Sequence, residues 1–371
     1  MLDYITTSNV YWGKFELTDV KQMAFGESER EKCTAKYGDL LVCEGGDIGR
    51  AAIWNYDYPI CIQNHLHRLR SYIPLCTKYF LYSLMYSKIT GNIKGKGIGL
   101  MSLSSNDLHN ITVALPPLAE QYRIVNAVDR LFSLIETIEC SRNELYNTIA
   151  QLQKTILSCA IHGRLVPQNP EDEPASELLK RINPKTEITC DNAQYRKLPN
   201  GWCVTKLGAI GRWQSGGTPS RANPEYYIGD IPWLKIADLQ DGYVKECSEK
   251  ISNEAICNSS AKINPEGSIA LAMYGSIGKL GILTFPAATN QAICVCSSFI
   301  GVDAKYLFYF LMSQRDDFVL KAGGGVQSNI SKEIIINHRI AIPPLPEQLR
   351  IVSKIEKLVS LLNDIESSLQ A

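Results

Sequence analysis

The sequence lacks the features that would place a protein outside the cell or in a membrane. Its N-terminus has no basic stretch followed by an apolar core, and no apolar run is long enough to span a bilayer. Twelve cysteines are scattered without a Cys-x-x-Cys pair, which excludes a zinc ribbon and a secreted disulfide framework. These absences predict a cytoplasmic protein with reduced thiols.

Charge of one sign and catalytic motifs are also missing. The 38 basic and 38 acidic residues give a formal net charge of +0, so any binding to nucleic acid must come from local patches. There is no phosphate loop, no His-Glu-x-x-His pair, no Gly-x-Ser-x-Gly elbow and no Asn-Pro-Pro-Tyr-like tetrapeptide. Cys61, His65 and His67 form the one candidate metal cluster, but strand alternation separates them. We therefore expect no catalytic residues, no metal and no cofactor in this chain.

The sequence does contain a long internal repeat. ALPPLAEQYRIV at 114–125 returns as AIPPLPEQLRIV at 341–352, and the difference between 341 and 114 gives an offset of 227 residues. The same offset aligns LFSLIETIE at 131–139 with LVSLLNDIE at 358–366. Upstream, YGDLLVCEGGDIGRAAI resembles EGSIALAMYGSIGKLGI with a slip of two residues. A period this long indicates a duplicated domain with its helix, because solenoid repeats are only about 20 to 50 residues long.

Each repeat divides into a globular part and a helical part. Short β-rich runs between Gly, Pro and Asn turns, with one helical pattern each, predict mixed α/β (α+β) domains at 1–113 and 197–340. The helical parts follow a double proline, at 114–165 and 341–371, and a polar linker covers 166–196.

The helical parts carry apolar residues at steps of three and four, which is typical of a coiled-coil seam. A helix from Leu118 to about His162 would be on the order of 65 Å long, so it needs a partner helix, and the other copy is the obvious candidate. Arg142 is the one polar interruption. The expected seam residues are Val125, Val128, Phe132, Ile135, Ile138, Leu145, Ile149, Leu152, Ile156, Val352, Ile355, Val359, Leu362, Ile365 and Leu369.

The two copies are unequal. The first has nothing that corresponds to Lys197–Pro232, and on the 227 offset Ala371 corresponds to Glu144, halfway along the first helix. A late translation start, a truncation or a recombined gene are all compatible with this difference. We expect the first globular domain to be N-terminally incomplete.

The second repeat carries six ordered motifs: LPNGWCVTKLGAI, SGGTPSR, YYIGDIPWLKIADL, GSIGKLGI, TNQAI and GGGVQSNIS. With the duplicated PPLxEQxRIV segment, they make the chain resemble the DNA-specificity subunits of Type I restriction-modification systems. The resemblance implies that each globular unit is a target-recognition domain for one half of a bipartite site in double-stranded DNA. It also implies that the helices pack as an antiparallel coiled coil, fix the half-site spacing and dock two methyltransferase subunits.

Through those subunits the chain would meet motor-nuclease (restriction) subunits. S-adenosylmethionine, ATP and Mg are expected in the partners. The chain itself is then a non-catalytic recognition subunit. Two alternatives stay open: a degenerate or regulatory subunit that binds the methyltransferase but reads at most one half-site, and a free-standing DNA enzyme.

Residues that read DNA are expected in loops, because loops can enter a groove while the sheet holds the register. The glycines of SGGTPSR could bring backbone amides to phosphate, and Asn or Gln side chains can pair with adenine edges. Trp233, Tyr306 and Phe308 are expected in the core. The candidates in the second domain are Ser215, Thr218, Ser220, Arg221, Tyr274, Ser276, Lys279, Asn290, Gln291, Gln327 and Asn329. Those in the first domain are Asn9, Arg50, Gln63, Asn64, His65 and Lys96.

Overall fold

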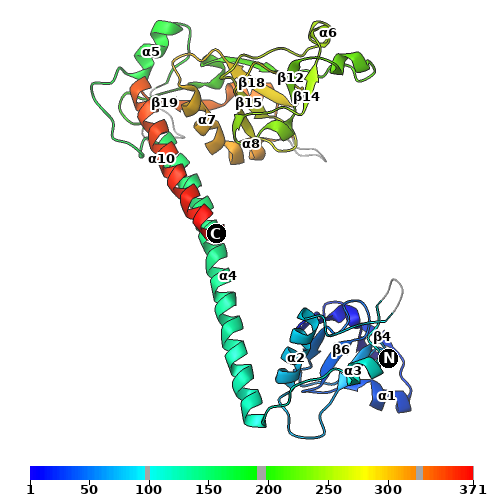
Figure 1. Ribbon diagram of the computed structural model, residues 1–371. Coiled ribbons are helices and arrows are strands. Elements are labelled where there is room, and N and C mark those ends of the chain that lie inside the picture. Colours follow the sequence, from blue (N-terminus) through cyan, green and yellow to red (C-terminus); the bar gives the residue numbers. More distant parts are fainter. Residues whose placement is uncertain (97–100, 190–197, 323–328, 371) are drawn as a thin grey trace. The chain divides into compact units, whose positions relative to one another are not determined.

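The computed structural model describes residues 1–96, 101–189, 198–322 and 329–370 (Figure 1). The chain divides into two compact units, unit 1 at Met1–Ser141 and unit 2 at Arg142–Ala371. Unit 1 contains the first globular part with the beginning of its long helix, unit 2 contains the rest of that helix and the second repeat, and both units have mixed α/β structure.

Unit 1 is built on two small sheets and the two-stranded antiparallel pair β2-β3. A four-stranded sheet has the order β4-β1-β8-β5 and a three-stranded sheet has the order β7-β6-β9. Its strands are β1 (Leu2–Ile5), β2 (Val10–Tyr11), β3 (Lys14–Phe15), β4 (Lys21–Met23), β5 (Thr34–Ala35), β6 (Leu40–Cys43), β7 (Ala51–Ile53), β8 (Ile60–Ile62) and β9 (Leu66–Leu69). Its short helices are α1 (Glu27–Cys33), α2 (Thr77–Ile89) and α3 (Ser105–His109).

Unit 2 has a larger central sheet of five strands in the order β11-β18-β15-β16-β13, beside a three-stranded sheet β14-β12-β17 and the pair β10-β19. Trp233, Tyr306 and Phe308 are buried, which confirms their expected place in the core. The strands are β10 (Cys203–Lys206), β11 (Arg212–Ser215), β12 (Ile231–Leu234), β13 (Gly242–Val244), β14 (Glu249–Ile251), β15 (Ile269–Ala272), β16 (Leu280–Leu283), β17 (Ala288–Thr289), β18 (Ile293–Ser297) and β19 (Arg339–Ile342). The short helices are α5 (Ala175–Ile182), α6 (Asn253–Cys257), α7 (Ala304–Ser313), α8 (Arg315–Lys321) and α9 (Lys332–Asn337).

The repeat is visible in individual hydrogen bonds at the junction between each globular part and its long helix. In unit 1 the Gln121 side chain accepts from the Cys76 amide at 3.0 Å and donates to the Pro116 carbonyl at 2.9 Å. In unit 2, at the 227 offset, Gln348 accepts from the Asp303 amide at 2.7 Å and donates to the Pro343 carbonyl at 3.0 Å. The Gln of the PPLxEQ motif therefore has a structural role in both copies.

Two further pairs of contacts repeat in the same way. The Tyr79 hydroxyl donates to the Ala114 carbonyl at 2.6 Å, and the Tyr306 hydroxyl donates to the Ala341 carbonyl at 2.9 Å. Likewise Lys78 pairs with Asp129 at 2.8 Å, and Lys305 pairs with Glu356 at 2.7 Å. These contacts tie the helix that follows the sheet to the start of the long helix, so the duplication preserved a junction as well as a fold.

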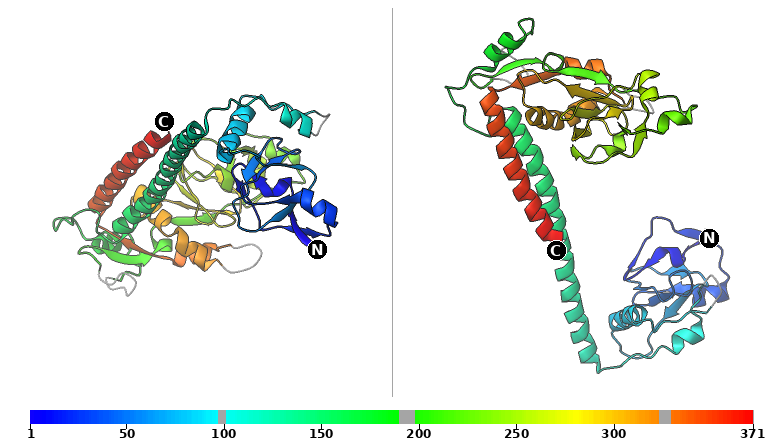
Figure 2. Two further views of the ribbon diagram at one scale, coloured as in Figure 1. Left: turned by 90° about the horizontal axis from the view of Figure 1, so that it is seen from below. Right: turned by 45° about the horizontal axis from the view of Figure 1, so that its top comes forward.

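The long helices are α4 (Leu118–Ile161) and α10 (Leu345–Gln370). Within unit 2, α10 runs beside the C-terminal part of α4 in the opposite direction, as Figures 1 and 2 show. Ile156, Leu157 and Val359 pack against the main core of unit 2, to which Ile351 and Ile355 belong. The expected antiparallel helix pair is thus confirmed. Within the described segments, none of the helices has the length and apolarity needed to cross a membrane.

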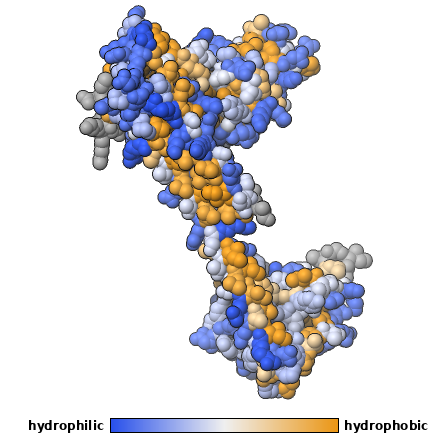
Figure 3. All heavy atoms as spheres, turned by 60° about the vertical axis from the view of Figure 1, so that its left-hand side comes forward, coloured by the Kyte–Doolittle hydropathy of each residue, from blue (hydrophilic) through white to orange (hydrophobic). Residues whose placement is uncertain are grey.

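The expected seam is covered only in part. Apolar side chains remain visible on the surface of the helices (Figure 3). Helix α10 has 26 residues against 44 in α4, so it cannot cover the whole apolar stripe of α4. Val125, Ile149, Val352, Ile355 and Leu362 are buried, and Val128, Ile156, Val359 and Leu369 are partly buried. Phe132, Ile135, Ile138, Leu145, Leu152 and Ile365 differ from the expectation, because each is more than a third exposed.

Candidate nucleic-acid interface

Three loops of unit 2 gather at one end of the five-stranded sheet. Ser215, the last residue of β11, lies opposite Cys294 of β18, and Ala272, the last residue of β15, lies opposite Ile293. Three segments therefore project from the same end of the sheet: the loop that starts at Ser215, the turn that precedes β18 and the hairpin between β15 and β16. The strand register brings together SGGTPSR, Asn290-Gln291 and the segment 273–279.

A fourth segment lies at the same end of the sheet. Asn329 forms an isolated bridge with Tyr274, and the amide of Ile330 donates to the Met273 carbonyl at 3.0 Å. Tyr274, Ser276, Gln291 and Asn329 are exposed, as loop residues that contact a ligand must be. Lys279 is half-buried at the end of the hairpin. Gln327, also a candidate, lies outside the described residues.

The two glycines of SGGTPSR are required by close packing. A Cβ at Gly216 would lie 2.2 Å from the Asn290 carbonyl oxygen, and one at Gly217 would lie 2.3 Å from the Ser260 hydroxyl. Their amides donate to the carbonyls of Ile293 and Thr289 at 3.0 and 2.9 Å. This differs from the expectation that the amides face phosphate, because both are already used to fasten the loop to the sheet.

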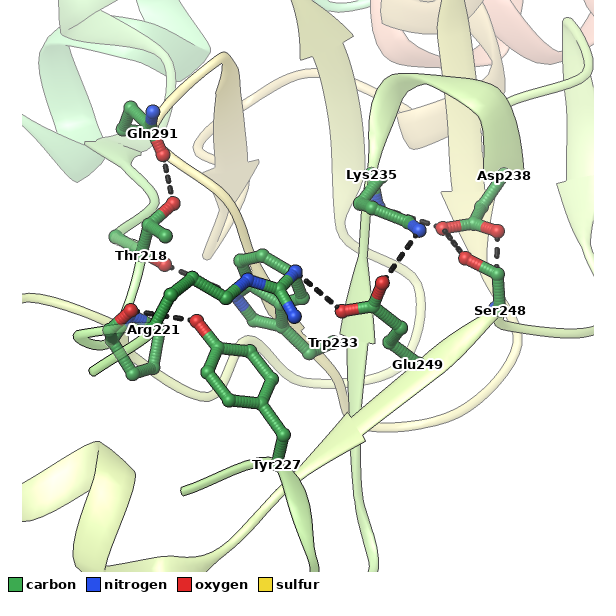
Figure 4. Close-up of polar contacts among 11 residues, drawn as sticks. Thr218, Arg221, Tyr227, Trp233, Lys235, Asp238, Ser248, Glu249 and Gln291 are labelled. Carbon is green, nitrogen blue, oxygen red and sulfur yellow. Dashed lines mark hydrogen bonds and ion pairs between the residues drawn. The ribbon is translucent and has the colours of Figure 1, made fainter. Parts of the chain in front are cut away.

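Arg221 is fixed by an aromatic and acidic cluster (Figure 4). Its guanidinium lies 3.9 Å from the centroid of the Tyr227 ring and donates to Glu249 at 2.7 Å. Lys235 donates to the other carboxylate oxygen of Glu249 at 2.8 Å. Hydrogen bonds from Lys235 and Arg221 hold the pKa of the Glu249 carboxyl below its usual range. One carboxylate thus bridges two cations of this surface.

Sequence reasoning missed Tyr227, Lys235 and Glu249. Glu249 is 28 residues from Arg221 along the chain. The pairing of β14 with β12 places Glu249 opposite Trp233, and the Arg221 guanidinium lies over the Trp233 ring. No local pattern in the sequence marks this contact. Thr218 and Gln291, both predicted, do meet, since the threonine hydroxyl donates to the glutamine side-chain oxygen.

Glu249→Gln should loosen this loop with a small loss of stability. The Arg221 and Lys235 side chains are 57% and 34% exposed, so solvent screens both ion pairs, and we expect a loss of about 1 kcal/mol or less in the free energy of unfolding. Trypsin should cleave after the released Arg221 several-fold faster, as followed by mass spectrometry. Glu246→Gln is the matched control, because Glu246 is exposed and has no ion pair among the described residues. Unchanged cleavage at Arg221 would contradict the role given to Glu249.

The candidates in unit 1 lie on corresponding segments. Gln63, Asn64 and His65 are exposed between β8 and β9, at the position of Asn290-Gln291 in unit 2. The His65 ring lies 3.7 Å from the Glu44 carboxylate, and Lys96 pairs with Asp107 at 3.0 Å. These side chains share one region of unit 1, on the loops next to β6, β8 and β9.

Two other candidates of unit 1 have structural roles. Asn9 is buried, accepts from the Thr6 amide at 2.9 Å and donates to the carbonyls of Glu16 and Asp19 at 3.0 and 2.9 Å. Its amide is fully used inside the unit, so we remove Asn9 from the interface. Arg50 donates to the Thr7 carbonyl at 2.7 Å and lies over the Tyr11 ring. Arg50 therefore stabilises the 3-10 turn Thr7–Asn9, to which Asn9 also belongs.

The comparisons with known proteins agree on one family. The protein-family model for the Type I restriction modification DNA specificity domain matches residues 3–147 and 199–371. The chain is 33% identical over 229 residues to the Type I restriction enzyme EcoR124I/EcoR124II specificity subunit of Escherichia coli, covering 55% of this chain and 56% of that protein. It is 23% identical to the EcoBI specificity subunit of Escherichia coli, covering 88% and 68%. The chain spans about half the length of the first of these relatives.

Two solved structures share the fold. One is a chain from a study of complex assembly and conformational transition of the type I R-M system, with a TM-score of 0.69, 18% identity and coverage of 100% of this chain and 86% of that chain. The other is the HsdS subunit from Thermoanaerobacter tengcongensis, with a TM-score of 0.61, 17% identity and coverage of 99% and 85%. Because the family model matches both repeats and most of the residues, this protein belongs to the Type I restriction modification DNA specificity domain family.

Proposed function

We propose that this chain is the non-catalytic DNA-specificity subunit of a Type I restriction-modification complex. The observation that carries the proposal is the double match of the family model, once to each repeat. The exposed polar loops at one end of the unit 2 sheet support it, because a rigid sheet with projecting loops can hold several side chains in register with base edges.

In unit 2 the proposed contacts divide into base-reading and phosphate-binding groups. Asn290, Gln291 and Asn329 carry amides that can pair with adenine, while Lys279 offers a positive charge to phosphate. Further hydroxyl groups at the same end of the sheet belong to Ser215, Ser220, Tyr274 and Ser276. Arg221 acts differently in this proposal: it is a positioning residue that holds Thr218 and Gln291 in place through its contacts with Tyr227 and Glu249.

In unit 1 the corresponding half-site contacts are Gln63, Asn64, His65 and Lys96. The proposed partners are double-stranded DNA and two methyltransferase subunits, which bind the long helices and carry S-adenosylmethionine. Restriction subunits that use ATP and Mg join through them. The exposed apolar side chains of α4, among them Leu131, Leu134 and Ile138, support a protein partner on this helix.

Co-expression with a methyltransferase subunit of the same system, followed by genome-wide sequencing of methylated adenine, tests the proposal. We expect a two-part motif. Asn290→Ala with Gln291→Ala should relax or abolish only the half read by unit 2, and Glu254→Ala on the exposed face of α6 should leave the motif unchanged. Methylation or cleavage by the isolated chain would overturn the assignment.

Inserting seven residues between Ser141 and Arg142, where the two units meet in the sequence, should lengthen the spacer between the half-sites. Seven residues of helix add about 10.5 Å and keep the apolar stripe in phase, which corresponds to about three base pairs at about 3.4 Å each. The same methylation sequencing measures the spacer. Two inserted heptads should add about six base pairs, and an unchanged spacer in both variants would contradict a ruler role for α4.

A second candidate function is a regulatory subunit that docks methyltransferase but reads at most one half-site. One observation favours it: among the strands that the structure describes, β9 of unit 1 pairs only with β6, whereas its counterpart β18 lies inside the five-stranded sheet of unit 2. In the methylation experiment this alternative yields a single half-site or no motif.

A further inference from the structure

The residue that follows β15 in unit 2 is held by two neighbouring segments at the end of the sheet from which the loops project. The Met273 amide donates to the Ala292 carbonyl at 2.8 Å, and the Met273 carbonyl accepts from the Ile330 amide at 3.0 Å. The next residue, Tyr274, forms an isolated bridge with Asn329. The three segments that meet here are among those proposed above to read DNA.

Unit 1 repeats this arrangement at the end of β6. The Glu44 amide donates to the His65 carbonyl at 2.9 Å, and the Glu44 carbonyl accepts from the Leu103 amide at 2.7 Å. The next residue, Gly45, forms an isolated bridge with Ser102. Each of these contacts has its counterpart in unit 2, so the two units present the same backbone scaffold and differ in the side chains that it carries.

The side chains on this scaffold belong to different chemical classes. Met273 of unit 2 is 4% exposed, whereas Glu44, which takes its position in unit 1, has a side chain that is 24% exposed. Where unit 2 has Ala292, unit 1 has His65, whose side chain is 66% exposed. Unit 1 therefore presents an acid and an imidazole where unit 2 has two apolar side chains.

The Glu44 carboxylate is oriented by the protein and still has room for a ligand. Ser102 Oγ donates to Glu44 Oε1 at 3.2 Å, which fixes the carboxylate at the end of the sheet. Glu44 Oε2 lies 3.7 Å from Nδ1 of His65, too far for a hydrogen bond. Because a carboxylate has about four lone-pair sites, Oε2 can accept from a ligand without breaking the contact to Ser102.

The chemistry of the base edges selects one ligand for this pair of side chains. Phosphate repels a carboxylate, so the groups of DNA that Glu44 can bind are the amino donors of the bases. In the major groove these are the amino groups of cytosine and adenine. Adenine places its N7 acceptor beside the amino group, and this acceptor repels a carboxylate. Cytosine lacks such a neighbour, and its guanine partner offers O6 and N7 to a donor such as the His65 ring.

We infer that Glu44 and His65 of unit 1 recognise a C·G base pair, with Glu44 accepting from the cytosine amino group and His65 donating to guanine. Ser102 is a positioning residue, because it acts through the Glu44 carboxylate. The inference rests on the proposed function and specifies it, since one duplicated scaffold then reads different bases in its two copies.

Methylation sequencing of the chain assembled with its methyltransferase subunit tests the inference. The half-site that Asn290→Ala with Gln291→Ala leaves intact is the one read by unit 1, and we expect it to require a C·G pair. Glu44→Gln keeps the size of the side chain. It should lower discrimination at that one position by about tenfold and admit adenine, because a glutamine amide can pair with N6 and N7 of adenine. Glu27→Gln, at an exposed position of α1, should leave the motif unchanged.

Competition binding of the same complex to duplexes with each of the four base pairs at this position gives a second measurement. His65→Ala should reduce the preference for C·G several-fold, and this variant should fold because the side chain is largely exposed. A unit 1 half-site without a required C·G pair, or a preference that both Glu44→Gln and His65→Ala leave unchanged, would overturn the inference while the proposed function stands. The absence of a two-part motif from the parent complex would overturn both.

Discussion

Gln348→Ala should lower the free energy of unfolding of unit 2 by about 2–4 kcal/mol. The Gln348 side chain is 0% exposed and makes three hydrogen bonds, from the Asp303 amide at 2.7 Å and to the carbonyls of Gly301 and Pro343 at 3.2 and 3.0 Å. Each bond contributes about 1 kcal/mol, and the partners left buried and unsatisfied add to the loss. Amide exchange of β15 and β18 measures the opening free energy of this unit.

Gln121→Ala is the matched control, since the internal repeat places the same residue in unit 1 with two comparable hydrogen bonds. It should accelerate exchange in β6 of unit 1 and leave β15 and β18 unaffected. If Gln348→Ala alters the stability of unit 2 by less than about 1 kcal/mol, the junction does not have the structural role assigned to it.

Acidification from pH 7 to pH 4 should destabilise unit 2 by about 3 kcal/mol through His338 alone. Burial lowers the pKa of this histidine from its ordinary 6.5 to about 4, and the nearby Lys321 ammonium lowers it further while Asp317 opposes the shift. Because the folded form binds its proton less readily, the unfolded chain takes up more protons between these two values. The stability contribution is therefore complete above pH 6.5 and falls as the pH falls towards 4.

The measurement is the urea unfolding free energy of unit 2 at a series of pH values. His338→Phe keeps a ring between Phe310 and Phe318 and should remove this part of the pH dependence. His162→Gln changes another histidine of the same unit and should retain it. An identical pH profile for the parent and His338→Phe would show that His338 is not the responsible group.

Much of the fold could be predicted from the sequence because its signals are local or repeated. The steps of three and four predict α4 as Leu118 to about His162, and the structure has Leu118–Ile161. Which apolar positions of the helix are covered could not be predicted, because coverage depends on how far α10 reaches and not on periodicity.

The residues of the candidate interface could likewise be predicted only where their signal is local in the sequence. Asn290, Gln291 and the SGGTPSR segment could be proposed as an interface because polar and glycine-rich loops between strands are visible in the sequence. Asn9 was misplaced because a buried, saturated asparagine has the same local signature as an exposed one. The contact between Arg221 and Glu249 was invisible, since it joins a loop residue to a strand residue 28 positions further along the chain.

The sequence by itself determined the duplication, the long helices and the class of fold. Only the tertiary structure decided that the glycine amides of SGGTPSR bond to the sheet and that Glu249 bridges Arg221 and Lys235. The physical reason is that periodicity and turn chemistry act over a few residues. Hydrogen-bond partners, burial and ion pairs depend instead on which distant strands lie side by side.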